Sequence, residues 1–125
     1  MIHLDYRDAR PIYTQIADGF REQILAGLLQ KGDRLPSVRD LATQLTINPN
    51  TIQRAYRELE IQGWIASVPG KGSFACGVPE QDLRKNQELL AEFDNIAQKL
   101  MLLGYTAQDL TARLQQGGNQ NAKTE

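Results

Sequence analysis

Cysteine and histidine are almost absent from this sequence of 125 residues, which holds one of each, Cys76 and His3. A single cysteine excludes an intramolecular disulfide, as is usual in a reducing cytosol. A single histidine, in the N-terminal arm, leaves no cluster of metal ligands and no convergent acid, base and nucleophile. We therefore predict no metal site, no cofactor, no catalytic residue and no enzymatic activity. Cys76 is interpreted as a small strand residue, with a redox switch as the alternative.

Long apolar runs and a strong net charge are also missing. No stretch approaches the roughly 20 apolar residues that a membrane-spanning helix needs, and the first ten residues carry charges in place of a signal peptide's apolar run. We therefore predict a cytoplasmic protein without a membrane partner. The formal charge of -1 does not indicate nucleic acid, but Glu58 and Glu60 are the only acids between Leu41 and Pro79. This locally basic stretch is compatible with DNA binding.

Hydrophobic periodicity predicts three helices in the first half of the chain. The first covers about Ile12 to Ala26 and has one apolar stripe. The second opens at Ser37, with Asp40 three residues later as an approximate capping box. A tight turn then leads to a third helix, with Asn48 placed as its N-cap and Pro49 as its first residue. Two short helices joined by such a turn are typical of a helix-turn-helix.

The third helix is predicted to have one apolar and one polar face. Apolar residues recur at i, i+3, i+4 and i+7: they are Ile52, Ala55, Tyr56 and Leu59. The opposite face carries hydrogen-bond donors and no carboxylate: Asn50, Thr51, Gln53, Arg54 and Arg57. Such side chains can contact bases and phosphates. We expect the N-terminal half of this helix to lie against an anionic partner.

A β-hairpin follows, with strands at residues 64–68 and 73–76 around a turn that holds Gly70, Lys71 and Gly72. Glycine backbone with one cation can approach phosphates closely, as a wing lying along a DNA groove would. The alternative is an ordinary surface turn with a solvated lysine. The position of the hairpin directly after a helix-turn-helix favours the interpretation as a wing.

Residues 80–103 predict a long helix with a wide apolar seam at nearly heptad spacing. The seam consists of Leu83, Leu90, Phe93, Ala97 and Leu100. A second helix begins at Thr106, with Asp109 completing its capping box. Because so wide an apolar face is not expected to stay in water, we predict a homodimer about a two-fold axis. In the alternative, the two helices pack back on their own winged helix and leave a monomer.

The predicted fold class is therefore mainly α with a small β-hairpin, a winged helix-turn-helix followed by a C-terminal helical hairpin for dimerisation. Its expected parts are an N-terminal arm at 1–10, a winged-helix DNA-binding domain at 11–77, a helical dimerisation segment at 78–116 and a disordered tail at 117–125.

Residues 11–76 resemble the DNA-binding domain of the GntR family of bacterial transcription regulators. The likeness lies in the motifs PIYTQI, GDRLPSVRDLA, NPNT, AYRELE, GWI and GKGSF. The short C-terminal part resembles that of the YtrA subfamily. The resemblance implies a winged helix and a homodimer on a palindromic double-stranded DNA operator. The subfamily further implies control of transport genes. We expect repression, since nothing resembles a surface for recruiting polymerase.

The family's DNA contacts fall here on the start of the second helix, the third helix and the hairpin turn: Ser37, Arg39, Asn48, Asn50, Thr51, Gln53, Gly70, Lys71 and Gly72. The residues themselves add Arg54 and Arg57, which we expect to meet phosphate. Some branches of the family carry arginines where this chain has Pro49 and Gln53. Because Asn and Gln suit adenine edges, we expect an A·T-containing half-site.

Several alternatives stay open. Arg39 could fork onto guanine, clamp a phosphate, or pair with Asp40 or Glu58 on a solvated face. Arg57 could form a surface pair within its own helix. The whole domain could be a winged helix used for protein contacts without DNA binding. A small-molecule effector is also open, and we expect one to act at the junction between the wing domain and the C-terminal helices.

Overall fold

The structure is a computed structural model that describes residues 2–124, with side chains described as far as Gly117. Its elements are α1 (Ile12–Leu25), α2 (Val38–Leu45), α3 (Pro49–Ile61), β1 (Ile65–Val68), β2 (Gly72–Ala75), α4 (Glu80–Leu102) and α5 (Ala107–Thr124). The chain divides into two compact units, Met1–Leu83 and Arg84–Glu125. The predicted fold class is confirmed: three helices and a hairpin form a winged helix-turn-helix, and two helices follow it. Within the described range, no helix is long and apolar enough to cross a bilayer.

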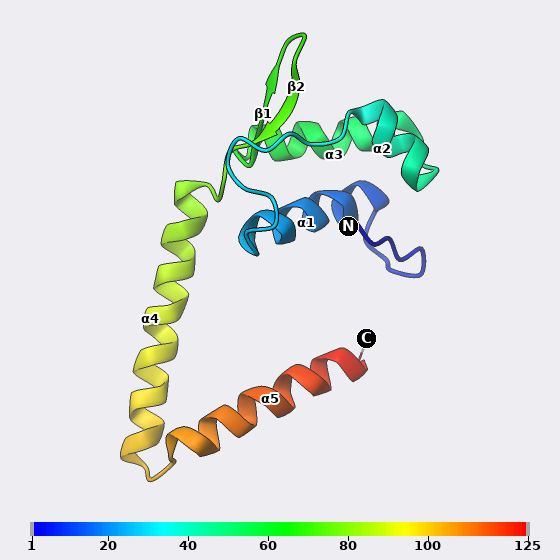
Figure 1. Ribbon diagram of the computed structural model, residues 1–125. Coiled ribbons are helices and arrows are strands. Elements are labelled where there is room, and N and C mark those ends of the chain that lie inside the picture. The colour runs from blue at the N-terminus through cyan, green and yellow to red at the C-terminus, as the bar shows by residue number, and fades with distance from the viewer. Residues whose placement is uncertain (1, 125) are drawn as a thin grey trace. The chain divides into compact units, whose positions relative to one another are not determined.

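The first unit is built around α3 (Figure 1). α1 and α2 both pack on this helix, and the hairpin follows its C-terminal end. The largest fully buried side chains come from α1, the segment before α2, α3 and β1: Ile16, Leu35, Ile52, Leu59 and Ile65. Burying a side chain of this size contributes about 1.5–3 kcal/mol. The apolar face of α3 therefore fixes how the helix is seated and which face remains in solvent.

The hairpin pairs β1 with β2 in antiparallel register from Ile65↔Ala75 to Val68↔Gly72. Residues 32–35 run along the other edge of β2. The N–H of Leu35 donates to the carbonyl of Ser73 at 2.8 Å, and the N–H of Ala75 donates to the carbonyl of Asp33 at 2.8 Å. The segment before α2 is thus joined to the wing.

The segment before α1, predicted as an N-terminal arm, is held against that helix. Ile2 belongs to the core with 8% of its surface exposed, and it occupies the space beside Gly19. Gln15 is buried; its amide group accepts from the N–H of Asp5 at 2.8 Å and donates to the carbonyls of Asp5 and Arg10. His3 is exposed.

In the second unit, α4 ends before Gly104, which has a φ of 106°. The capping box at the start of α5 is confirmed in both directions. Thr106 Oγ1 accepts from the N–H of Asp109 at 3.0 Å, and Asp109 Oδ2 accepts from the N–H of Thr106 at 2.9 Å. α5 then runs to Thr124, so its bounds include residues 117–124, which were assigned to a disordered tail. Glu125 lies outside the described residues.

Candidate nucleic-acid interface

The start of α3 is capped by a side chain of its own. Asn48 Oδ1 accepts from the backbone N–H of Asn50 at 2.8 Å, and Pro49 occupies the first turn. The predicted cap is confirmed, and it gives the helix a defined first residue. All three residues are exposed. The cap uses the oxygen of the Asn48 amide and not its N–H₂ group, so a DNA contact through that group stays a prediction.

The two faces of α3 are those that the periodicity predicted. The apolar face is buried, with no more than 3% of any side chain exposed: Ile52, Ala55, Tyr56 and Leu59. The other face exposes Asn50, Gln53, Arg54 and Arg57, and leaves Thr51 half-buried. These side chains can all donate hydrogen bonds to base edges or phosphates. None of them is a carboxylate, so the face suits an anionic surface.

The side chain of Arg54 is oriented by Tyr13 of α1, a contact that was not predicted from the sequence. Its guanidinium carbon lies 3.9 Å from the ring centroid of Tyr13, and its Nη2 donates to the Tyr13 hydroxyl at 3.3 Å. A cation–π contact at an exposed site is worth about 0.5–1 kcal/mol. The stack leaves the arginine exposed, and its predicted phosphate contact stays a prediction.

Tyr56 connects α3 to the start of α2. Its hydroxyl donates to the carbonyl of Pro36 at 2.6 Å, and its ring meets Phe20 edge-on with centroids 5.6 Å apart. Burial raises the pKa of this phenol. One residue further on, Ser37 Oγ accepts from the N–H of Asp40 at 3.0 Å and caps α2. The Tyr56 bond therefore ties α3 to the segment that leads into α2, and the Ser37 bond fixes where α2 begins.

Arg39 extends from the first turn of α2 and is exposed. Among the side chains that the structure describes, none forms an ion pair with Arg39. The alternative pairing with Asp40 or Glu58 is therefore not formed. The same is true of a surface pair for Arg57. Both guanidinium groups keep their donors for another acceptor.

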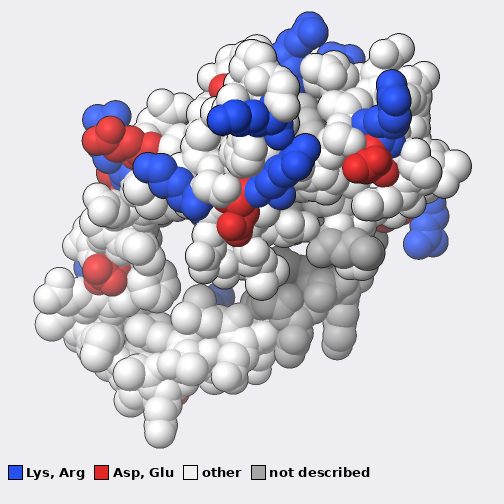
Figure 2. Space-filling view, turned by 45° about the horizontal axis from the view of Figure 1, so that its top comes forward, with Lys and Arg blue, Asp and Glu red and all other residues white. Residues whose placement is uncertain are grey.

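The hairpin turn presents Gly70 and Lys71 at its tip. The N–H of Lys71 donates to the carbonyl of Val68 at 2.9 Å, and Gly70 has a φ of 75°, which favours glycine. On β1, one residue pair from the turn, Ser67 donates to the carboxylate of Glu60 at 3.0 Å. The tip therefore carries a cation, whereas the Glu60 carboxylate accepts from Ser67 and the Asp33 carboxylate accepts from the N–H of Gln30. Figure 2 shows Lys and Arg side chains spread over the visible face of this unit, with fewer acids between them.

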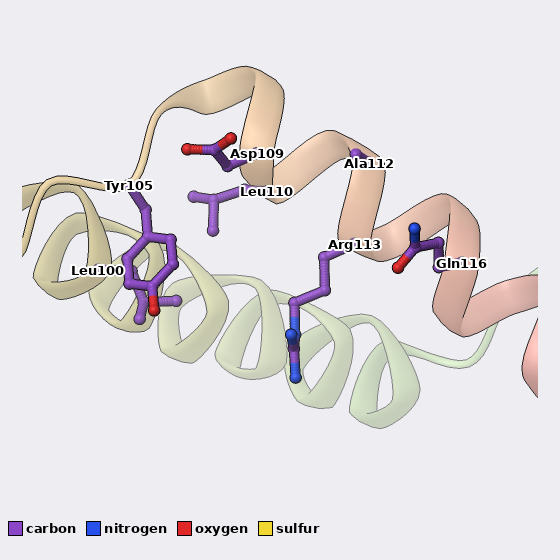
Figure 3. A pocket seen from close by; sticks show the side chains of 7 residues that line it. All are labelled: Leu100, Tyr105, Asp109, Leu110, Ala112, Arg113 and Gln116. Atoms are coloured by element: carbon purple, nitrogen blue, oxygen red, sulfur yellow. The ribbon is translucent and has the colours of Figure 1, made fainter.

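The two C-terminal helices, α4 and α5, offer apolar surface. No residue of α4 is buried, and along the predicted seam Leu83, Leu90 and Phe93 are about half exposed or more, while Ala97 and Leu100 are half-buried. At the turn from α4 to α5, Leu100, Tyr105 and Leu110 lie beside one another (Figure 3). They border a hollow of about 660 Å³. Surface of this kind is not expected to stay bare in water.

Residues 12–75 match the family described as bacterial regulatory proteins, gntR family. The chain belongs to this family. This chain is 47% identical over 74 residues to the HTH-type transcriptional repressor YtrA of Bacillus subtilis, a match that covers 59% of this chain and 57% of that protein. The predicted family and the likeness to YtrA proteins are confirmed. The family is one of DNA-binding transcriptional regulators, as predicted, and not a family of enzymes.

Solved structures agree with this placement. YtrA from Sulfolobus acidocaldarius, a GntR-family transcription factor, is 34% identical to this chain. The two superpose with a TM-score of 0.59 over 72% of this chain and 95% of that one. The structure of AraR(DBD) in complex with operator ORR3 is 27% identical, with a TM-score of 0.53 over 59% of this chain and 89% of that one.

The structure brings most of the predicted DNA-binding residues onto the exposed surface of the first unit. It also places near them the cation Arg34, which was not among the residues predicted to bind DNA. Arg34 lies against Gly72, where a Cβ atom would stand 3.0 Å from the arginine Nε. Its backbone pairs with Phe74 in an isolated bridge. In the sequence, Arg34 stands out only as part of a family motif, because a bridge between residues 40 positions apart leaves no local periodicity. None of the described residues forms a group of His, Cys, Asp or Glu that could hold a metal ion.

Proposed function

We propose that this chain is a repressor that binds a palindromic operator as a homodimer. The observation that carries the proposal is the exposed face of α3, which holds hydrogen-bond donors and no carboxylate on a helix seated by its buried opposite face. An α-helix fits the major groove of B-DNA, where each base pair presents its own pattern of donors and acceptors. Repression itself is proposed from the partial match to the Bacillus YtrA repressor.

The chemistry of the exposed face suggests what it reads. Amide side chains such as Asn50 and Gln53 can pair with the N6 and N7 positions of adenine. Arg57 extends from the same face and suits a phosphate, which positions the helix without reading sequence. We therefore infer an A·T-containing half-site. We also infer that the protein acts in the cytoplasm, because bacterial operator DNA lies there.

Dimerisation would cover the apolar seam of α4. An isologous contact places the same surface of both protomers together about a two-fold axis. Two copies of α3 would then meet two half-sites of a palindrome, and the half-site spacing would follow from the distance between the two helices. The seam of Leu83, Leu90, Phe93, Ala97 and Leu100 is the surface that we assign to this contact.

The test begins with selection of bound duplexes from a randomised pool, followed by measurement of affinity at several salt concentrations. We expect log affinity to fall steeply with log salt, because each neutralised phosphate releases condensed counterions. Arg39→Ala should weaken binding to the selected site by about 1–3 kcal/mol. Lys99→Ala, which removes an equal charge from an exposed position on α4, is the matched control and should bind like the wild type.

Two results would contradict the proposal. Absence of binding to every pool, or binding that does not respond to salt, would favour a winged helix used for protein contacts. Equal losses in Arg39→Ala and Lys99→Ala would show that affinity follows net charge and not the start of α2.

A further inference from the structure

Arg34 is placed beside the wing by backbone pairing and by the core. The bonds between residues 32–35 and β2 fix its Cα next to the hairpin, since Leu35 N–H and Asp33 carbonyl both pair with that strand. Leu35, the next residue, is buried with 2% of its surface exposed. Because successive side chains of an extended segment point to opposite faces, the side chain of Arg34 extends to the exposed face.

Gly72 provides the surface on which the Arg34 side chain rests. A Cβ atom at position 72 would stand 3.0 Å from Nε and 3.3 Å from Nη2 of Arg34, closer than ordinary van der Waals contact. The guanidinium group therefore occupies space that any other residue at this position would fill. Gly72 also has a φ of 120°, so its backbone strongly favours glycine. The glycine both turns the chain and admits the arginine.

The Arg34 guanidinium has no acceptor of its own. No described residue forms a hydrogen bond or ion pair with its side chain, although the group is exposed. Glu60 borders the same shallow groove of about 560 Å³, but its carboxylate accepts from Ser67 at 3.0 Å. Arg34 is thus held by packing and backbone pairing, and its planar set of donors stays unused. An arginine in this state suits a phosphate, which it can bind through two parallel N–H groups.

Lys71 lies in the same groove at the turn. We propose that Arg34, seated on Gly72, is a second cation of the wing and binds a phosphate of the operator backbone beside the one that Lys71 meets. Gly72, predicted to contact DNA itself, then acts indirectly, because it gives space to the Arg34 side chain. This inference rests on the proposed function, since it needs a duplex against the wing.

The experiment measures operator affinity against salt concentration for the wild type, Arg34→Ala, Arg34→Gln, Arg34→Lys and Lys99→Ala. A phosphate contact contributes about 0.9 to the slope of log affinity against log salt. For a dimer with two wings, Arg34→Ala and Arg34→Gln should therefore make the fall of log affinity with log salt shallower, reducing the magnitude of the slope by about 1.8. Arg34→Lys keeps the charge and should retain most of the slope, and Lys99→Ala should leave the slope unchanged.

Two further measurements separate a DNA contact from a structural role. Thermal unfolding of the same variants reports whether the wing stays folded, and we expect Arg34→Gln to unfold within a few degrees of the wild type. Binding to single-base variants of the operator should weaken by one common factor in Arg34→Ala, because a phosphate carries no sequence information.

An unchanged slope in Arg34→Ala and Arg34→Gln, with or without a fall in unfolding temperature, would overturn the inference while leaving operator binding intact. So would a loss confined to one base position, which would indicate base contact. If the wild type itself bound DNA without salt dependence, the proposed function would fail first. Gly72→Ala is not used, because strain at its positive φ would move the turn whatever Arg34 does.

Discussion

Tyr56 joins the two helices of the helix-turn-helix through one hydroxyl group. Tyr56→Phe keeps the ring against Phe20 but leaves the Pro36 carbonyl without the bond that it accepts at 2.6 Å. The bond is partly buried, and losing one hydrogen bond of this kind costs about 1 kcal/mol, so we expect the free energy of unfolding in urea to fall by about that amount. Tyr13→Phe is the control: Tyr13 is half-buried and its bond to Arg54 is 3.3 Å long, so the loss should be smaller. Equal losses would contradict the assignment.

The same phenol gives a pH signature. Burial raises the pKa of Tyr56 above its ordinary value of 10.0, so the folded chain holds this proton more tightly than the unfolded chain. The stability contributed by the neutral phenol is therefore complete below the unfolded pKa and is lost as pH rises above it. The difference in unfolding free energy between wild type and Tyr56→Phe should thus be smaller at about pH 11 than at about pH 8. A larger difference in alkali would count against a buried neutral hydroxyl.

At the scale of an element, the turn between α2 and α3 contains a residue in an unfavourable conformation. Thr46 ends α2 in the left-handed region, with φ 55° and ψ 50°, and it is the one non-glycine residue with positive φ in the described range. A β-branched side chain is poorly suited to this region, whereas asparagine enters it readily. The turn between the two helices therefore carries backbone strain at Thr46.

Thr46→Asn should relieve that cost and raise the free energy of unfolding by about 0.5–1 kcal/mol. The measurement is the midpoint of urea unfolding at unchanged slope. Thr43→Asn makes the same replacement inside the right-handed part of α2, where Thr43 donates to the Arg39 carbonyl at 3.0 Å, and it should give no gain. A lower midpoint for Thr46→Asn would show that the threonine is held there by a contact worth more than the strain.

At the scale of the whole molecule, the apolar seam of α4 determines the oligomeric state that we propose. Leu90 is 62% exposed, and Leu90→Asp would place a carboxylate in the dimer contact without a partner. Because burying an unpaired charge is costly, the dimer dissociation constant should rise by more than about tenfold. Sedimentation equilibrium measures that constant, and operator affinity should fall with it, because a monomer holds only one half-site.

Asn95→Asp is the matched control, since it adds the same charge to α4 on the face opposite Leu90. It should sediment as the wild type does. A wild-type chain that sediments as a monomer would refute the dimer and favour helices packed on their own winged helix. A dimer that both variants leave intact would place the contact elsewhere.

Local features were read correctly from the sequence. The caps at Ser37, Asn48 and Thr106, the two faces of α3 and the hairpin turn all depend on residues within four positions of one another or on a simple repeat. Hydrogen bonds of a cap and the side-chain positions of a helix follow from such spacing with little help from the rest of the chain. These features account for the fold class and for most of the candidate interface.

Only the tertiary structure decided how distant residues meet. The seat of Arg34 on Gly72, the stack of Arg54 on Tyr13 and the buried Gln15 that holds the segment before α1 each join parts of the chain with no shared repeat. Such contacts arise when burial of the common core brings separate elements together, and no local pattern of residues records them. The sequence alone therefore determined which helix would present its polar face, and the packed fold decided which cations stand beside it.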